Sequence, residues 1–150
     1  MMDTSMKMII SRVNDAISRI LAGGLHRAIP RSFLGRLRES IQDLRANLSS
    51  QNQLFQSLEN LKKTLEDIAD TLLVLPTDQG ALLARYLHEI TESIESMLSS
   101  DLFRSGEESR RIFQMNISWF EMLLRAVSVL VEQDEKDKYT SPIGTKPRKR

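Results

Sequence analysis

Apolar residues recur at intervals of three and four positions along almost the whole of this 150-residue chain. This spacing places them on one face of an α-helix, whereas a β-strand needs alternation with a period of two, and no stretch alternates for long enough. We therefore expect an all-α fold, an antiparallel helical bundle of about five helices. A chain of this length buries about 70% of its unfolded surface, so it can hold a core without disulfides or structural metal.

The expected helix boundaries follow from residues that begin or end helices. Gly23 and Gly24 should close the first helix, because glycine adopts the left-handed backbone of a helix end at little cost. The polar run 49–53 separates the second helix from the third, although one bent helix of about 42 residues fits the same spacing. Thr77 or Asp78 can cap the fourth helix. The first four expected helices cover residues 4–22, 32–48, 52–75 and 78–100.

The last helix should begin at Ser105, which forms a capping box with Glu108. It carries two apolar stripes, so it is either central in its own bundle or packed against another chain. We expect one bundle domain over residues 1–137. The basic residues of 138–150, with two prolines and a glycine, are typical of a flexible tail that is disordered in isolation.

Several classes of chemistry lack the residues that they need. The chain has no cysteine, which excludes thiolate nucleophiles and cysteine-ligated metal, and it has no serine elbow or phosphate-binding glycine loop. His88, Glu92 and Glu95 share a helical face, but a metal pair would need a second histidine helix. We expect no catalytic residue, no metal, no cofactor and no enzymatic activity. No apolar run approaches the roughly 20 residues that cross a bilayer, so we expect a cytoplasmic protein without membrane contact.

Positive and negative charges lie in different parts of the chain. Residues 12–38 hold six basic and one acidic residue, a formal charge of +5, whereas residues 59–103 hold three basic and nine acidic residues, a charge of −6. A row of arginines can follow a phosphate backbone without reading bases. The candidate nucleic-acid-binding residues are the arginines of this basic region and its continuation, Arg12, Arg19, Arg27, Arg31, Arg38 and Arg45.

Two stripes carry this hypothesis. Arg12 and Arg19 share a face of the first helix, and Asp15 can pair with both. Arg31, Arg38 and Arg45 repeat every seven residues and have no acidic neighbour three or four positions away. The alternative, which stays open, is that these arginines pair with acidic residues of other helices in the bundle, chiefly Glu66, Asp70, Glu92 or Glu95.

On this architecture and the two arginine spacings, the chain resembles the helical small subunit of CRISPR interference complexes. That resemblance covers residues 1 to about 137. It implies a non-enzymatic subunit of a ribonucleoprotein that contacts RNA or single-stranded DNA through phosphates, beside other subunits and copies of itself.

A protein-interaction module, such as an adaptor, chaperone or virion component, is the competing hypothesis. It rests on the second apolar stripe of the last helix. The candidate protein-interface residues are Met115, Trp119 and Met122. An apolar stripe that the bundle leaves uncovered would bind a partner.

Overall fold

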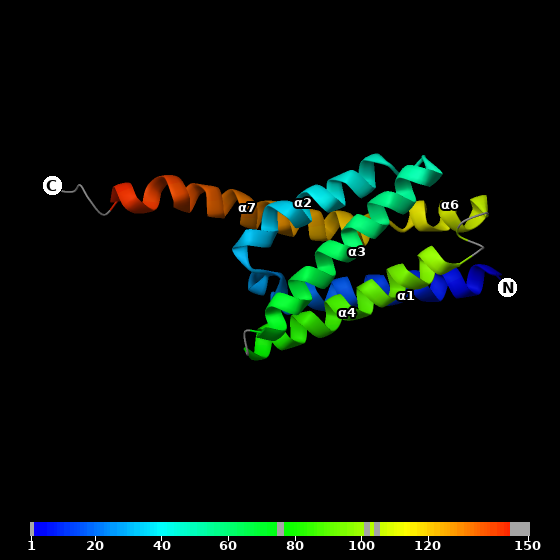
Figure 1. Cartoon of the computed structure of the whole chain (residues 1–150), viewed down its shortest axis with the longest axis horizontal. Helices are drawn as coiled ribbons and strands as arrows, with labels where there is room; N and C mark the ends of the chain where they lie inside the picture. The colour runs from blue at the N-terminus through cyan, green and yellow to red at the C-terminus, as the bar shows by residue number, and fades with distance from the viewer. Residues whose placement is uncertain (1, 75–76, 101–102, 104–105, 145–150) are drawn as a thin grey trace.

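The computed structural model describes residues 2–74, 77–100, 103 and 106–144, and every regular element within these ranges is helical (Figure 1). The all-α prediction is confirmed. The elements are α1 (Met2–Ala22), a 3-10 helix η1 (Leu25–Ala28), α2 (Arg31–Ala46), α3 (Gln51–Val74), α4 (Asp78–Ser99), α6 (Glu107–Met115) and α7 (Ser118–Gly144).

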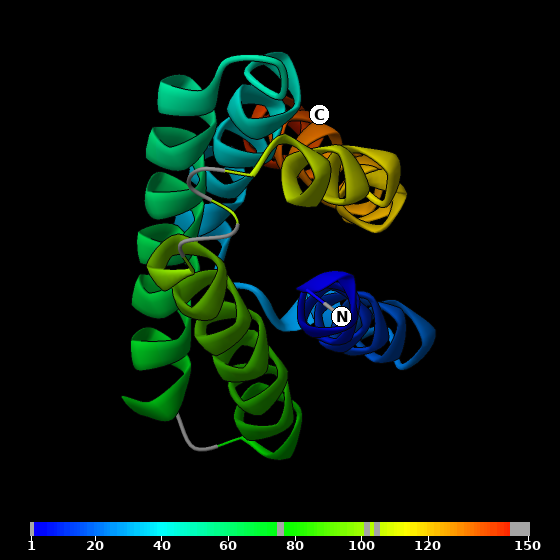
Figure 2. The same cartoon turned by 90° about the vertical axis from the view of Figure 1, so that its right-hand side faces the viewer.

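Five of these helices form a ring in the order α1, α4, α3, α2 and α7, and α7 closes the ring by packing against α1 (Figure 2). Helix α6 precedes α7 and also packs against α1. Neighbours in the ring run antiparallel except α1 and α7, which run in the same direction (Figure 1). A ring with an odd number of helices must contain such a parallel pair. The antiparallel arrangement that we expected therefore holds for four of the five neighbouring helix pairs in the ring.

The first helix ends where the glycines predict. Gly24 has φ 68°, a left-handed conformation that favours glycine. The N–H groups of Gly23 and Gly24 donate to the carbonyls of Arg19 and Leu21 at 3.1 Å, which closes the last turn of α1. The chain then passes through η1 into α2.

Helices α2 and α3 are separate, so the alternative of one long bent helix is wrong. Polar side chains hold the turn between them. Asn47 donates to Asp43 Oδ1 at 3.2 Å and to Ser57 Oγ at 3.0 Å, and Ser57 Oγ donates to Asp43 Oδ2 at 2.9 Å. These three bonds fasten the end of α2 to the first turns of α3, and Asn47 is also the C-cap of α2.

Thr77 caps α4 as expected, because its Oγ1 accepts the N–H of Gly80 at 3.0 Å. The expected capping box of the last helix includes Ser105, which lies outside the described residues. Gly106 is the N-cap of α6 and makes no side-chain capping bond.

The expectation of one continuous last helix is wrong, because the chain breaks between α6 and α7. Asn116 stands at the break. Its side-chain Nδ2 donates to the Ile112 carbonyl at 2.8 Å, and its N–H donates to the Phe113 carbonyl at 3.0 Å. A short polar side chain that bonds the preceding turn competes with the helical hydrogen bonds.

Helix α7 continues to Gly144, past the boundary that we expected at residue 137. No proline or glycine occurs between residues 137 and 142, and Pro142 is the first residue there that opposes a helix. The segment after residue 137 projects beyond the other helices (Figure 1). Residues 145–150 of the expected tail lie outside the described residues.

The core fills the inside of the ring. Ile17, Leu37, Leu58 and Ile90 are at most 1% exposed. One aromatic row joins α3 to the last two helices: Phe103 stacks on Phe55 at 5.4 Å between ring centroids, contacts Phe113 edge-on at 5.8 Å, and Phe113 lies 6.4 Å from Phe120. Each such buried side chain contributes about 1.5–3 kcal/mol through removal from water.

Helix α7 is one of the five helices of the ring. The expectation that the last helix is central in the bundle is therefore wrong. Its first stripe, including Phe120, Leu124 and Val127, is buried. Because a ring helix has one face on the core, the second stripe is left on the outside.

Candidate functional site

Arg31 lies at the border between α2 and α7, and Arg38 and Arg45 follow it along α2 at intervals of seven residues. Arg31 pairs with two carboxylates of α7, Asp134 at 3.3 Å and Asp137 at 3.9 Å. Arg38 is half-buried, and its Nε is buried without a hydrogen-bond partner among the described residues. Arg45 is exposed. The stripe exists as predicted, but one end is neutralised and its middle is partly covered.

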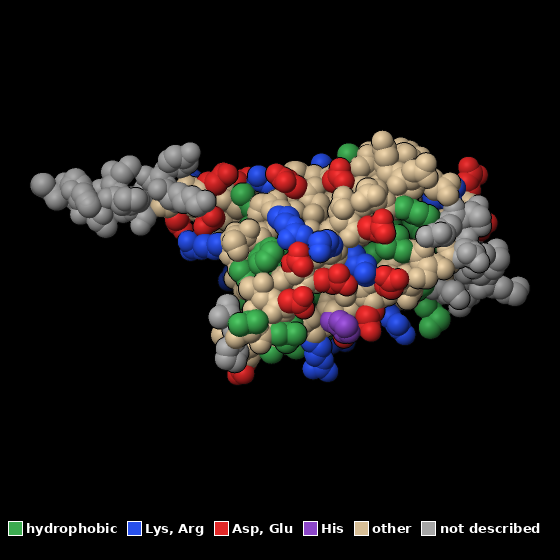
Figure 3. Space-filling model, viewed as in Figure 1, with side chains coloured by type: hydrophobic (Ala, Val, Ile, Leu, Met, Phe, Trp, Pro, Cys, Tyr) green, Lys and Arg blue, Asp and Glu red, His purple; other side chains and the backbone are tan. Residues whose placement is uncertain are grey.

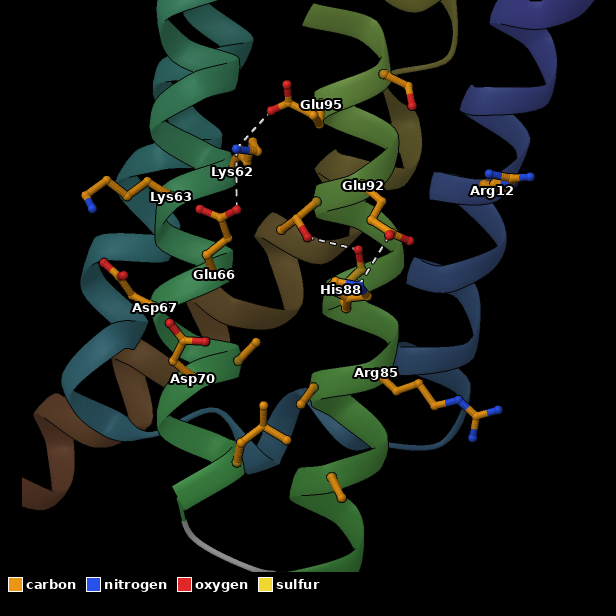
Figure 4. Close-up of a pocket in the computed structure, with 16 residues that line it drawn as sticks. Arg12, Lys62, Lys63, Glu66, Asp67, Asp70, Arg85, His88, Glu92 and Glu95 are labelled. Carbon is orange, nitrogen blue, oxygen red and sulfur yellow. Dashed lines mark hydrogen bonds and ion pairs between the residues drawn. The ribbon is translucent and has the colours of Figure 1, made fainter. Parts of the chain in front are cut away.

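The arginines of α1 lie on another side of the ring. Arg19 Nε donates to Asp15 Oδ2 at 3.0 Å, and hydrogen bonds to Asp15 and to Tyr86 of α4 raise the pKa of Arg19. Arg12 stands at the edge of the α3–α4 surface and points away from His88 and Glu92 (Figure 4). The Asp15–Arg19 pair follows the i, i+4 spacing of the sequence.

Of the six candidate arginines, two lie close enough to line the same hollow. Arg27 of η1 and Arg31 line one hollow with Asp134 and Asp137 of α7. Because α7 lies between α1 and α2 in the ring, the two arginine stripes do not join into one surface.

Three of the four acidic residues that we expected to pair with these arginines, Glu66, Glu92 and Glu95, pair with other residues. Lys62 pairs with Glu66 at 3.4 Å and with Glu95 at 3.0 Å, and His88 pairs with Glu92 at 3.3 Å. None of the stripe arginines forms an ion pair with the four expected acids in the described part of the chain. The contact of Arg31 with α7 joins residues about one hundred positions apart, and no local spacing signals it.

Helices α3 and α4 share a broad hollow of about 1160 Å³, where acidic and basic side chains alternate (Figures 3 and 4). The hydrogen bond from Lys62 lowers the pKa of Glu95 and, reciprocally, raises that of Lys62. On a neighbouring edge Arg36 pairs with Asp67 at 2.8 Å. The described residues contain no group of three side chains that could hold a metal ion. This hollow is a solvated network of ion pairs without a nucleophile held against a base.

The second apolar stripe lies on the outer surface of α6 and α7. Met115 is 76% exposed, Met122 is 43% exposed and Val129 is 51% exposed, whereas Trp119 and Ala126 are half-buried. We call these five residues the α7 outer face. It contains the three predicted interface residues and adds Ala126 and Val129, which the apolar spacing of the sequence already placed on the same stripe.

Two shallow grooves border this face on the side of α1 and η1. The first lies between α1 and α7, has a volume of about 510 Å³, and includes Ser11, Asn14, Asn116 and Trp119. The second is formed by η1 and α7 and has a volume of about 560 Å³; it is lined by His26, Arg27, Ala126, Val129, Leu130 and Gln133. The lining of the first groove is largely polar and also includes Lys7, Asp15 and Ser18, whereas Ala126, Val129 and Leu130 extend the apolar surface into the second groove.

Four other large apolar residues are exposed in the part of the chain that the structure describes. Leu73, Val74 and Leu82 lie near the α3–α4 turn, and Met8 lies on α1. None of these positions repeats along a helix in the way that the α7 outer face does.

No described helix is long and apolar enough to cross a membrane. Comparison with known proteins gave no match to a family model, a curated protein or a solved structure.

Proposed function

We propose that this protein is a helical interaction module that binds a helix of a protein partner on the α7 outer face. The observation that carries the proposal is the repeat of exposed apolar side chains at Met115, Met122 and Val129, one every seven residues. An exposed apolar row at this spacing matches the surface that an amphipathic helix covers. A helix seated there would also cover the two half-buried members of the face.

The charge pattern supports a protein partner over a nucleic acid. Along α7 the outer face is flanked by Arg125 and Glu132, which are both exposed and opposite in sign. A phosphate backbone instead favours a surface of one sign. The candidate arginines are dispersed, and two of them, Arg19 and Arg31, already pair with carboxylates.

Site-specific photo-crosslinking tests the proposal. The photoreactive residue benzoylphenylalanine would replace Met122 in the full chain expressed in its native cells, and a matched variant would carry it at Glu59, which is exposed on α3. We expect discrete protein adducts from position 122 that excess unlabelled protein competes away, and none from position 59. The same weak background at both positions would contradict the proposal.

Nucleic-acid binding is a second candidate function, now resting on two of the six candidate arginines. It is supported by Arg38 and Arg45, which form no ion pair with a described carboxylate, and by the resemblance to the CRISPR small subunit. Titration of single-stranded DNA or RNA at increasing salt tests it. Steeply salt-dependent binding that Arg38→Glu and Arg45→Glu together abolish would support it, and unchanged affinity in that variant would reject it.

A further inference from the structure

The partner that the α7 outer face fits best can be inferred from the face itself, an inference that rests on the proposed function. We propose that the occupant is a second copy of this chain, with the two α7 helices packed antiparallel about a two-fold axis near Leu124. The contact is isologous, so each copy presents the same residues.

The spacing of the face is that of a coiled-coil seam. Met115, Trp119, Met122, Ala126, Val129 and the exposed Gln133 follow one another at intervals of four, three, four, three and four. Alternation of three and four is the a/d pattern that lets two helices interlock side chains. The core-facing stripe of α7 uses other positions, such as Phe120, Leu124 and Val127, although Trp119 of the seam also packs partly against the core.

The antiparallel register places large side chains against smaller ones. Within α7, Trp119 faces Val129 of the second copy and Met122 faces its Ala126, with the reciprocal contacts across the axis. Met115 lies on α6, before the break, and is outside this register. A parallel pair would instead set Trp119 against Trp119 and leave a gap where Ala126 meets Ala126. Close packing of apolar contacts favours the antiparallel arrangement.

The charges beside the seam balance in the same register. Arg125 is exposed on one flank, and Glu121, one turn before it, is half-buried on the same side. Near the two-fold axis, Arg125 and Glu121 of the two copies together form a cluster of two cations and two anions. Farther from the axis, the neutral Ser118 lies beside Glu132 of the second copy. Like charges therefore do not face each other there.

The ring leaves room for this contact, because the core and the neighbouring helices lie on the other sides of α7 (Figure 2). Within α7, from Trp119 to Gln133, the seam is ~21 Å long at 1.5 Å per residue. One helix pair of this length falls at the lower end of the size range of stable interfaces. We therefore expect dimerisation with a Kd on the order of micromolar.

Cysteine cross-linking tests the register directly, because the natural chain contains no cysteine. The variants Arg125→Cys, Ser118→Cys and Glu132→Cys alter three exposed positions on the flank of the seam. In the antiparallel pair the two copies of residue 125 are offset by only ~3 Å along the helix axis, whereas two copies of residue 118 are offset by ~18 Å. Residue 118 of one copy and residue 132 of the other are again offset by ~3 Å.

We expect Arg125→Cys to form a disulfide-linked dimer at about 100 µM, above the expected Kd. Ser118→Cys and Glu132→Cys should each stay unlinked alone and link when mixed. Self-linking of both Ser118→Cys and Glu132→Cys, with no further link when the two are mixed, would contradict the antiparallel register and overturn the proposal. Absence of any link from the three variants, with a monomer in sedimentation at the same concentration, would also overturn it.

Sedimentation of two point variants provides a matched control. Val129→Asp should abolish the dimer, whereas Leu73→Asp, at an exposed apolar residue on α3, should leave it unchanged. Equal loss of the dimer in both variants would argue against the outer face. If the natural protein is monomeric but photo-crosslinking at position 122 captures a different protein, the self-association is wrong and the interaction module stands.

Discussion

At the scale of single residues, the tertiary environment decides what each candidate side chain can do. Arg31 has no acidic neighbour on its own helix, yet it meets Asp134 and Asp137 of α7. Arg31 is 73% exposed, so this pair adds at most about 1 kcal/mol to stability. Its larger effect is on function, because it removes one cation from the surface that a phosphate backbone would contact.

Replacement of Phe103 by a small residue should lower the free energy of unfolding strongly. Phe103 is fully buried, and its ring contacts those of Phe55 and Phe113. We expect Phe103→Ala to lower the free energy of unfolding by about 3–5 kcal/mol, because it removes the ring and leaves a cavity. Urea denaturation measures this change. Phe103→Leu, which retains more of the buried volume, should cost clearly less, and equal losses would contradict a packing role.

His26 should make stability depend on pH. Burial lowers the pKa of His26 below its usual 6.5, and the nearby charge of Arg27 lowers it further. The unfolded chain therefore binds the proton more readily, so the free energy of unfolding should fall as pH drops through about 6.5. His26→Gln should flatten this dependence in urea denaturation between pH of about 7.5 and 5.5. His88→Gln, at an exposed histidine, should retain the contribution of His26; equal slopes in His26→Gln and the natural protein would refute the assignment.

At the scale of helices, local signals located most boundaries correctly. Glycine at the end of α1 and threonine at the start of α4 do what their backbone and side-chain chemistry favours. The break between α6 and α7 was missed because the apolar spacing continues across Asn116 with no proline or glycine to mark the break. The bond of Asn116 to Ile112 competes with the helix only when the surrounding packing permits the bend.

Two glycine substitutions should act in opposite directions. A side chain at Gly24 meets no atom within 4 Å, but φ of 68° disfavours any residue with a Cβ, so Gly24→Ala should cost about 1–2 kcal/mol. Gly35 lies inside α2 with open space around its Cβ position, so Gly35→Ala should stabilise by about 0.5–1 kcal/mol. Thermal unfolding of both variants tests this, and a gain at Gly24 or a loss at Gly35 would be inconsistent with these backbone conformations.

At the scale of the whole molecule, the closed ring explains why α7 keeps an apolar outer face. Each ring helix buries one face, whereas Met115, Met122 and Val129 of the α7 outer face remain exposed. The same ring separates the arginines of α1 from those of α2. One arrangement therefore weakens the case for a continuous phosphate-binding surface and strengthens the case for a helix-binding one.

The projecting end of α7 should contribute little to the fold. The described ion pairs between α7 and α2 end at Asp137, and the helix then extends past the rest of the ring (Figure 1). A chain that ends at Asp137 should have the same Tm as the full chain to within about 2 °C, since 1 kcal/mol corresponds to a few degrees at this size. Differential scanning calorimetry measures this, and a larger drop would mean that residues 138–150 pack on the bundle.

The helical class, most helix ends and the apolar stripe of Met115, Trp119, Met122 and Val129 were predictable without the fold, because they depend on local backbone preference and on the period of one helix. Only the tertiary structure decided which stripe is covered and which arginine is neutralised. Those outcomes depend on the order of helices in the ring, which joins residues as distant as Arg31 and Asp134. Helical periodicity contains no information about that order, so the assignment of α7 as a ring member with a free outer face required the fold.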